Sequence, residues 1–93
     1  MVESAGTILF FKAQWAAGIC DIFRPTVQNV ADRLGMRVRE VEADDWPELC
    51  GEYGVMNIPA TALDGRPDLR AIIGALEESK LFEVLMERLL LSI

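Results

Sequence analysis

Hydrophobic residues in the first part of the chain follow a strand pattern and then a helical pattern. Residues 7–11 form a continuous apolar run rich in strand formers, which predicts a central strand buried on both faces. Over residues 19–34 the apolar positions recur at helical spacing, and Gly35 follows as the expected C-cap. Pro25 lies inside this helix, where it removes a backbone donor and is expected to produce a kink.

The next segment predicts a strand followed by a short helix. Residues 36–43 have an imperfect strand alternation. Asp44 and Asp45 are predicted to act as helix caps rather than as an acid/base pair, because Pro47 follows them as a residue of the first turn. This helix is expected to end at Gly54.

The last part of the chain predicts a hairpin and a helix. A third strand is expected over residues 55–63 and a fourth over residues 68–73, with a hairpin turn at Asp64 and Gly65 between them. Residues 75–91 predict an amphipathic helix.

The resulting order, β-α-β-α-β-β-α, predicts the fold class. Its first half is a βαβ unit, which gives parallel strands, and its second half contains a hairpin, which is antiparallel. We therefore expect an α/β fold with a four-stranded mixed sheet and helices on both faces. The sequence contains no repeat, linker or low-complexity segment, so residues 1–93 are expected to form one domain.

The amino-acid composition and charge argue against several classes of function. The formal net charge is −6 and there is no basic patch, so nucleic acid is not an expected partner. No apolar run is long enough to span a bilayer, and the N-terminus is acidic where a secretory signal is basic, so we expect a cytoplasmic protein without a membrane partner. The chain has no histidine, which excludes a Cys-His catalytic pair within it, and Cys20 and Cys50 make a poor zinc site.

Several segments resemble the thioredoxin family. Residues 13–15 (AQW) resemble the segment before its Cys-Gly-Pro-Cys motif, and Pro25 matches a helix-kinking proline that follows the second cysteine. Residues 53–61 (YGVMNIPAT) resemble the family's Tyr-Gly-Ile/Val-x-x-Ile-Pro-Thr segment, whose proline is cis and faces the active site. Residues 74–76 (GAL) resemble the start of the last helix. The resemblance implies the thioredoxin fold, in a short glutaredoxin-like form because only about six residues precede the first strand.

The family's redox motif is incomplete here. The corresponding segment reads Trp15-Ala16-Ala17-Gly18-Ile19-Cys20. Counting back from Pro25 aligns Cys20 with the second cysteine and Ala17 with the first, whereas counting forward from Trp15 puts Ala16 in the first place. Pro25 is the stronger anchor, because a helix kink is harder to shift than a loop residue. On either count the first cysteine is an alanine.

Other departures concern the surroundings of the motif. Phe10 stands where the family has a buried aspartate, and Lys12 stands where a tryptophan normally backs the motif. The nearest likeness is the thioredoxin-like domain of multidomain monothiol glutaredoxins, where the first cysteine is also an alanine. Monothiol glutaredoxins that hold iron–sulfur clusters retain that cysteine, so no cofactor is expected. Lys12 either lowers the pKa of a nearby thiol or extends to solvent, and the second is favoured.

The first functional hypothesis is a thiol–disulfide oxidoreductase acting at most by monothiol exchange through Cys20, with Cys50 as a candidate second thiol. A bridge between them requires Cα atoms within about 7 Å. We expect Trp15 and Ile19 to shield Cys20. The favoured alternative is that both cysteines belong to the core. If Ala16 or Ala17 instead replaces a native cysteine, the parent protein is an ordinary dithiol oxidoreductase.

The second hypothesis is a redox-inactive binding module. The resemblance implies a groove for an extended peptide, with binding residues Trp15, Ala17, Gly18, Ile58 and Pro59. The expected partner is a protein or peptide with an extended segment or a disulfide. Alternatively, Trp15 only covers the end of the sheet and Pro59 only shapes the fold. Residues 89–91 with Ile93 are interpreted as core packing, with a dimer face as the alternative.

Overall fold

The computed structural model describes residues 6–91 and has the predicted order of elements. The strands are β1 (Thr7–Lys12), β2 (Arg37–Glu42), β3 (Ala60–Leu63) and β4 (Ile72–Ile73). The helices are α1 (Ala17–Leu34), α2 (Pro47–Tyr53) and α3 (Glu78–Leu91), and the single 3-10 turns are η1 (Gln14–Ala16), η2 (Ala43–Asp45) and η3 (Pro67–Leu69).

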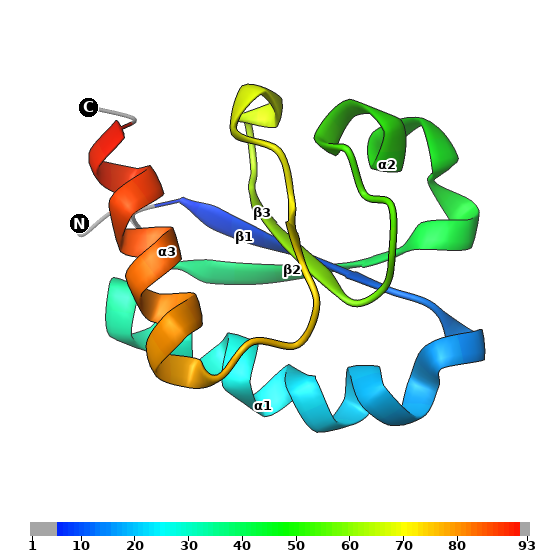
Figure 1. Ribbon diagram of the computed structural model, residues 1–93, viewed down its shortest axis with the longest axis horizontal. Coiled ribbons are helices and arrows are strands. Elements are labelled where there is room, and N and C mark those ends of the chain that lie inside the picture. Colours follow the sequence, from blue (N-terminus) through cyan, green and yellow to red (C-terminus); the bar gives the residue numbers. More distant parts are fainter. Residues whose placement is uncertain (1–5, 92–93) are drawn as a thin grey trace.

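The strands form the predicted four-stranded mixed sheet in the order β2-β1-β3-β4 (Figure 1). β1 pairs in parallel with β2, as expected for the two strands of a βαβ unit. It pairs antiparallel with β3, which in turn pairs antiparallel with β4. The α/β fold with helices on both faces is therefore confirmed.

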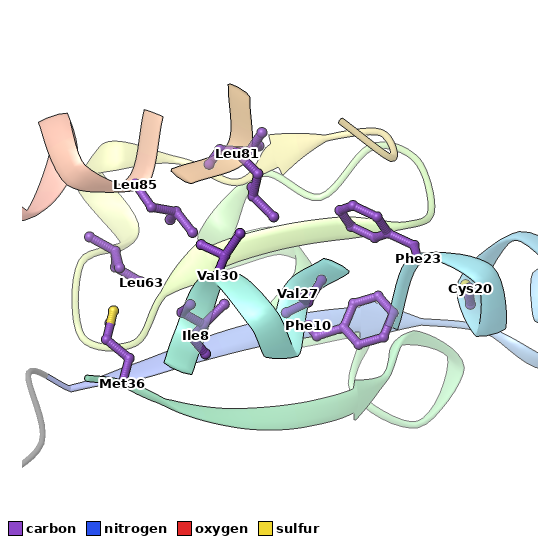
Figure 2. Close-up of a cluster of buried hydrophobic side chains, with 12 residues drawn as sticks. Ile8, Phe10, Cys20, Phe23, Val27, Val30, Met36, Leu63, Leu81 and Leu85 are labelled. Carbon is purple, nitrogen blue, oxygen red and sulfur yellow. The ribbon is translucent and has the colours of Figure 1, made fainter. Parts of the chain in front are cut away.

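The apolar residues of β1 are buried on both faces of the sheet, because successive side chains of a strand point in opposite directions. Ile8 and Phe10 join a cluster formed with α1 and α3, and Figure 2 shows the side chains of this cluster. Leu9 and Phe11 join a second cluster on the α2 side, which also contains Tyr53. The continuous burial of the central strand is thus as predicted.

The third strand is shorter than the predicted range of residues 55–63. Only Ala60–Leu63 is in the sheet, and residues 55–59 form an irregular loop that ends at the cis Ile58–Pro59 peptide bond. Pro59 has no N–H for a ladder, and the N–H of Ile58 donates to the side-chain oxygen of Asn57 at 2.9 Å. The sequence-based prediction of a longer strand did not take into account that residues 58 and 59 have no free N–H group for pairing with a neighbouring strand.

The fourth strand is also shorter than the predicted residues 68–73. Pro67 opens the 3-10 turn η3, and Arg70 follows with a positive φ of 61°. The chain therefore returns to the sheet only at Ile72–Ile73. A proline and a left-handed residue within so short a segment prevent a continuous strand.

The helix starts differ from the predictions as well. α1 begins at Ala17 rather than residue 19, and α3 begins at Glu78 rather than residue 75. Asp44 and Asp45 lie in η2, and the N-cap of α2 is Trp46, which makes no side-chain capping bond. The predicted capping role of both aspartates is therefore wrong, because the extra 3-10 turn displaces them from the helix start.

Gly51, inside α2, and Gly54, its C-cap, allow a matched test of the left-handed backbone conformation at the helix end. Gly54 caps the helix with a φ of 69°, and the next N–H, of Val55, donates to the Cys50 carbonyl at 2.8 Å. A Cβ at Gly54 would also collide with the guanidinium of Arg70, whereas one at Gly51 meets nothing. We expect Gly54→Ala to lower the free energy of unfolding by about 1–2 kcal/mol.

The control, Gly51→Ala, is expected to raise that free energy by about 0.5–1 kcal/mol, because alanine has the higher helix propensity. Urea unfolding followed by circular dichroism measures both. Equal effects of the two substitutions would contradict a left-handed cap at Gly54.

Candidate functional site

The predicted motif residues Trp15, Ala17, Gly18 and Cys20 lie where β1 ends and α1 begins. η1 joins these two elements and carries Trp15, and η2 lies at the same end of the molecule, after β2 (Figure 1). The parallel pairing of β1 and β2 explains this arrangement, since both strands end at the same edge of the sheet.

One pocket at this edge, called here the thiol pocket, has a volume of about 410 Å³. It is lined by Lys12, Ala13, Gln14, Ala17, Cys20, Asp21, Arg24, Glu42 and Asp45. Cys20 is only 1% exposed, and it also belongs to the core cluster of α1 and α3. Figure 2 shows it at the end of that cluster, beyond the rings of Phe10 and Phe23. Its thiol is therefore a core group that borders the pocket.

Ion pairs occupy one side of the thiol pocket. Glu40 accepts from Arg24 Nε at 3.0 Å and pairs with Lys12 Nζ at 3.1 Å, and Arg24 also contacts Asp21 at 2.8 Å. The bond from Arg24, followed by that from Lys12, lowers the pKa of Glu40 below its usual value, although burial opposes this. The same carboxylates, Glu40 first, raise the pKa of Arg24. The Lys12 ammonium therefore forms an ion pair with Glu40.

A second pocket, called here the apolar pocket, has a volume of about 190 Å³ and is lined by Trp15. Its lining comprises Trp15, Ala43, Cys50, Val55, Met56, Asn57 and Ile58. The side chains of Trp15 and Met56 are 67% and 88% exposed, which is unusual for residues of this size. The pocket is therefore a partly open apolar surface without a charged residue in its lining.

Cys50 closes one side of the apolar pocket. Its sulfur lies 3.8 Å from the carbonyl oxygen of Ala43. Burial raises the pKa of the Cys50 thiol, and the negative charge of Asp44 raises it further. Both effects favour the protonated thiol, which is the unreactive form.

The predicted peptide-groove residues are distributed over the two pocket linings and their surroundings. Trp15 and Ile58 line the apolar pocket, whereas Ala17 lines the thiol pocket. Gly18 is exposed but belongs to neither lining, and Pro59 is fully buried. Sequence reasoning missed Val55, Met56 and Asn57, because it assigned these residues to a strand; the proline that follows them was the available signal for a loop.

The two thiols lie in different parts of the core. Cys20 belongs to the cluster on the α1 and α3 face, whereas Cys50 packs against the cluster on the α2 face. Both are free cysteines. Cys20 is buried within its own core cluster, whereas Trp15 and Ile19, which were expected to shield it, are themselves 67% and 47% exposed.

A family model described as Thioredoxin matches residues 2–87. The chain belongs to the thioredoxin family.

Several solved structures have a similar fold. A mutant thioredoxin from Halobacterium salinarum NRC-1 is 23% identical with a TM-score of 0.71, over 87% of this chain and 72% of that chain. Thioredoxin 1 from Thermosipho africanus TCF52B is 17% identical with a TM-score of 0.69, over 92% and 97% of the two chains. A malarial protein is 15% identical with a TM-score of 0.65, over 87% and 93%. No curated protein matches this chain.

This thioredoxin-family chain has one cysteine where the motif has two. α1 begins at Ala17, and Cys20 follows one helical turn later in the same pocket lining. Residues three apart face each other on a helix, whereas Ala16 precedes the helix as its N-cap. Ala17 therefore occupies the position from which a second sulfur would face Cys20.

Phe10 fills the space beneath the motif with an aromatic ring. Its side chain is fully buried, and its ring meets that of Phe23 edge-on at 5.9 Å between centroids. On β3, Thr61 lies opposite Phe10, and its hydroxyl has no hydrogen-bond partner among residues 6–91. This part of the thioredoxin-family core thus contains no buried carboxylate and one unsatisfied hydroxyl.

Removing the hydroxyl of Thr61 is expected to stabilise the protein. Thr61→Val keeps the shape of the side chain and removes a buried polar group whose desolvation is uncompensated, so the free energy of unfolding should rise by about 1 kcal/mol. Thr61→Ser keeps the hydroxyl and removes the methyl group, and it should lower that free energy by about 1 kcal/mol. Urea unfolding compares the two. A loss of stability in Thr61→Val would mean that the hydroxyl has a partner.

Within residues 6–91, no three His, Cys, Asp or Glu side chains are placed to hold a metal ion. None of the described helices is long and apolar enough to cross a membrane.

Proposed function

We propose that this chain is a redox-inactive thioredoxin-fold module that binds an extended peptide segment of a protein partner. One observation carries the proposal: the motif thiol of Cys20 is buried, whereas the apolar residues Trp15 and Met56, which line the apolar pocket, are exposed. Thiol–disulfide exchange needs an accessible thiolate, whereas peptide recognition needs an accessible apolar surface.

The loop beside the apolar pocket supports this mode of binding. In the described part of the chain, the backbone N–H groups of Met56 and Asn57 donate to no protein acceptor. An extended peptide can therefore pair with this backbone while one of its apolar side chains enters the pocket at Trp15 and Ile58. Main-chain bonds then supply affinity, and the pocket supplies selectivity.

Selection from a displayed library of random peptides of about twelve residues tests the proposal. A Cys20→Ala/Cys50→Ala variant is expected to enrich the same peptides as the wild type, and Trp15→Ala is expected to enrich none of them. Ile22→Ala is the matched control, because Ile22 is an exposed apolar residue that lines neither pocket. Enrichment that disappears with the cysteines would overturn the proposal.

The second candidate function is monothiol exchange through Cys20, and one observation favours it: Cys20 lines the thiol pocket. In this reaction the Cys20 thiolate would attack a substrate disulfide, form a mixed disulfide and release the other sulfur as a thiolate. Alkylation of Cys20 in a Cys50→Ser background distinguishes the two candidates. The binding module predicts slow alkylation of the native protein over pH 6–9 and fast alkylation only after unfolding, whereas monothiol exchange requires fast native alkylation.

A further inference from the structure

The two elements beside the apolar pocket, η2 and α2, belong to a strongly acidic interval of the sequence, although the pocket lining itself carries no charge. No lysine or arginine occurs between Arg39 and Arg66, and the acidic residues of that interval are Glu40, Glu42, Asp44, Asp45, Glu48, Glu52 and Asp64. Glu40 is neutralised by Lys12 and Arg24, and Glu42 accepts a hydrogen bond from the backbone of Gln14. This interval is therefore the acidic part of a chain whose other segments have mixed charge.

Four of these carboxylates, on η2 and α2, are exposed and unpaired in the described part of the chain. Asp44, Asp45, Glu48 and Glu52 are all exposed and form no ion pair within residues 6–91. Asp44 and Asp45 belong to η2, which lies at the same end of the molecule as η1 (Figure 1).

Asp44 lies next to the apolar pocket, and Asp45 lines the thiol pocket. Ala43, the residue before Asp44, lines the apolar pocket, and the charge of Asp44 acts on the Cys50 thiol there. Asp45 lines the thiol pocket. A peptide that places a side chain between Trp15 and Ile58 therefore passes beside both carboxylates.

The cations nearest to this edge do not cancel these charges. Lys12 and Arg24 are paired with Glu40. The guanidinium of Arg70 lies over Gly54, on the far side of α2's C-terminus. Unpaired negative charge thus remains on the η2 side of the apolar pocket.

We propose that the partner segment is basic: an extended peptide with an apolar anchor in the apolar pocket and flanking lysine or arginine residues facing Asp44 and Asp45. This inference rests on the proposed peptide-binding function and adds the chemistry of the partner. Complementary charge increases the rate of encounter and excludes wrong partners. A second copy of this chain, with its own charge of −6, and nucleic acid are both repelled by this surface.

The test uses the peptides selected by the wild-type protein, resynthesised with a fluorescent label. Their flanking positions should be enriched in lysine and arginine relative to aspartate and glutamate. The Asp44→Asn/Asp45→Asn variant should bind these peptides about five-fold more weakly in anisotropy titrations at low salt. Raising the salt to about 0.5 M should reduce the difference, because such exposed charges are screened.

The matched control is Glu83→Gln/Glu87→Gln, which makes the same change in net charge on α3. Both residues are exposed and lie on the helix at the opposite end of the molecule from η2 (Figure 1). This control should bind like the wild type, which separates a local effect from a change in overall charge.

The outcomes separate this inference from the proposed function. Selected peptides with neutral or acidic flanks, or equal weakening by both double variants, would overturn the basic-partner inference while leaving peptide binding intact. A wild-type selection that enriches nothing beyond the Trp15→Ala variant would overturn the proposed function and this inference with it.

Discussion

Ala17→Cys is expected to convert the chain into an active dithiol reductase. Residue 17 is the first residue of α1, where backbone N–H groups are unpaired and the helix dipole favours negative charge. A thiol there has a depressed pKa, and Cys20 faces it one turn later as the resolving sulfur. The substitution therefore supplies the exposed attacking thiolate that the native sequence lacks.

The expected gain is at least about ten-fold over the wild type. A fall of a thiol pKa from about 8.5 to about 7 raises its thiolate fraction at pH 7 from about 3% to about 50%. Reduction of insulin disulfides with dithiothreitol as the electron donor measures the rate. The introduced cysteine attacks the insulin disulfide, Cys20 then displaces the reduced insulin chain, and dithiothreitol reduces the disulfide that forms between the introduced cysteine and Cys20.

Ala16→Cys is the control for this gain. Ala16 is the N-cap and belongs to η1, and its backbone is not α-helical, so a thiol at that position is held less regularly relative to Cys20 than one at residue 17. We expect its activity to remain near that of the wild type. Equal activity of the two variants would show that the alignment of the motif from Trp15 is as good as the alignment from Pro25.

Phe10→Asp is expected to lower the free energy of unfolding more than any other substitution considered. Phe10 is fully buried and packs edge-on against Phe23. Loss of a buried phenylalanine costs about 3–5 kcal/mol, and the unpaired carboxylate adds to this at neutral pH. Domains of this size have about 5–15 kcal/mol in total, so the variant is expected to be partly unfolded at pH 7. The carboxylate that the family has at this position is therefore expected to destabilise this core.

The loss should depend on pH in a defined direction. Burial raises the folded-state pKa of the introduced carboxyl above its unfolded value of about 3.9, so the native state binds the proton more tightly. The charge penalty is absent below about pH 3.9, grows as the pH rises toward the folded pKa and is complete above it. Urea unfolding at pH 4 and at pH 8, each compared with the wild type, measures this difference.

Phe10→Leu is the matched control. It keeps an apolar side chain and should cost less than about 1.5 kcal/mol, equally at both pH values. A pH-independent loss in Phe10→Asp would show that water reaches the introduced carboxylate and that the core beneath the motif is open.

Local patterns in the sequence predicted the order and type of the elements. A strand buried on both faces requires an unbroken apolar run, as in β1, and a helix buried on one face requires apolar residues at helical spacing, as in α1. Both patterns can be recognised from the sequence alone. The motif comparison also identified Ala17, Cys20 and Phe10 as the places where the family's chemistry is missing. Such features depend on residues close together in sequence.

The length of the third strand was overestimated although its cause is local. Residues 55–59 have strand-like composition, but the bond from Ile58 to Asn57 and the missing N–H of Pro59 exclude them from the ladder. The distribution of the expected groove residues over a thiol pocket and an apolar pocket has a different cause, since segments far apart in sequence line these pockets together.

By itself, the sequence determined the thioredoxin fold, the loss of the first motif cysteine and the acidity of residues 40–64, since these follow from residue types and their spacing. Only the tertiary structure decided that Cys20 is buried while Trp15 is exposed, and that Cys50 lies on the other face of the sheet. The physical reason is that burial is a property of packing between elements. Neighbouring residues of one turn can face the core or the solvent, and the position of the sheet beneath them decides which.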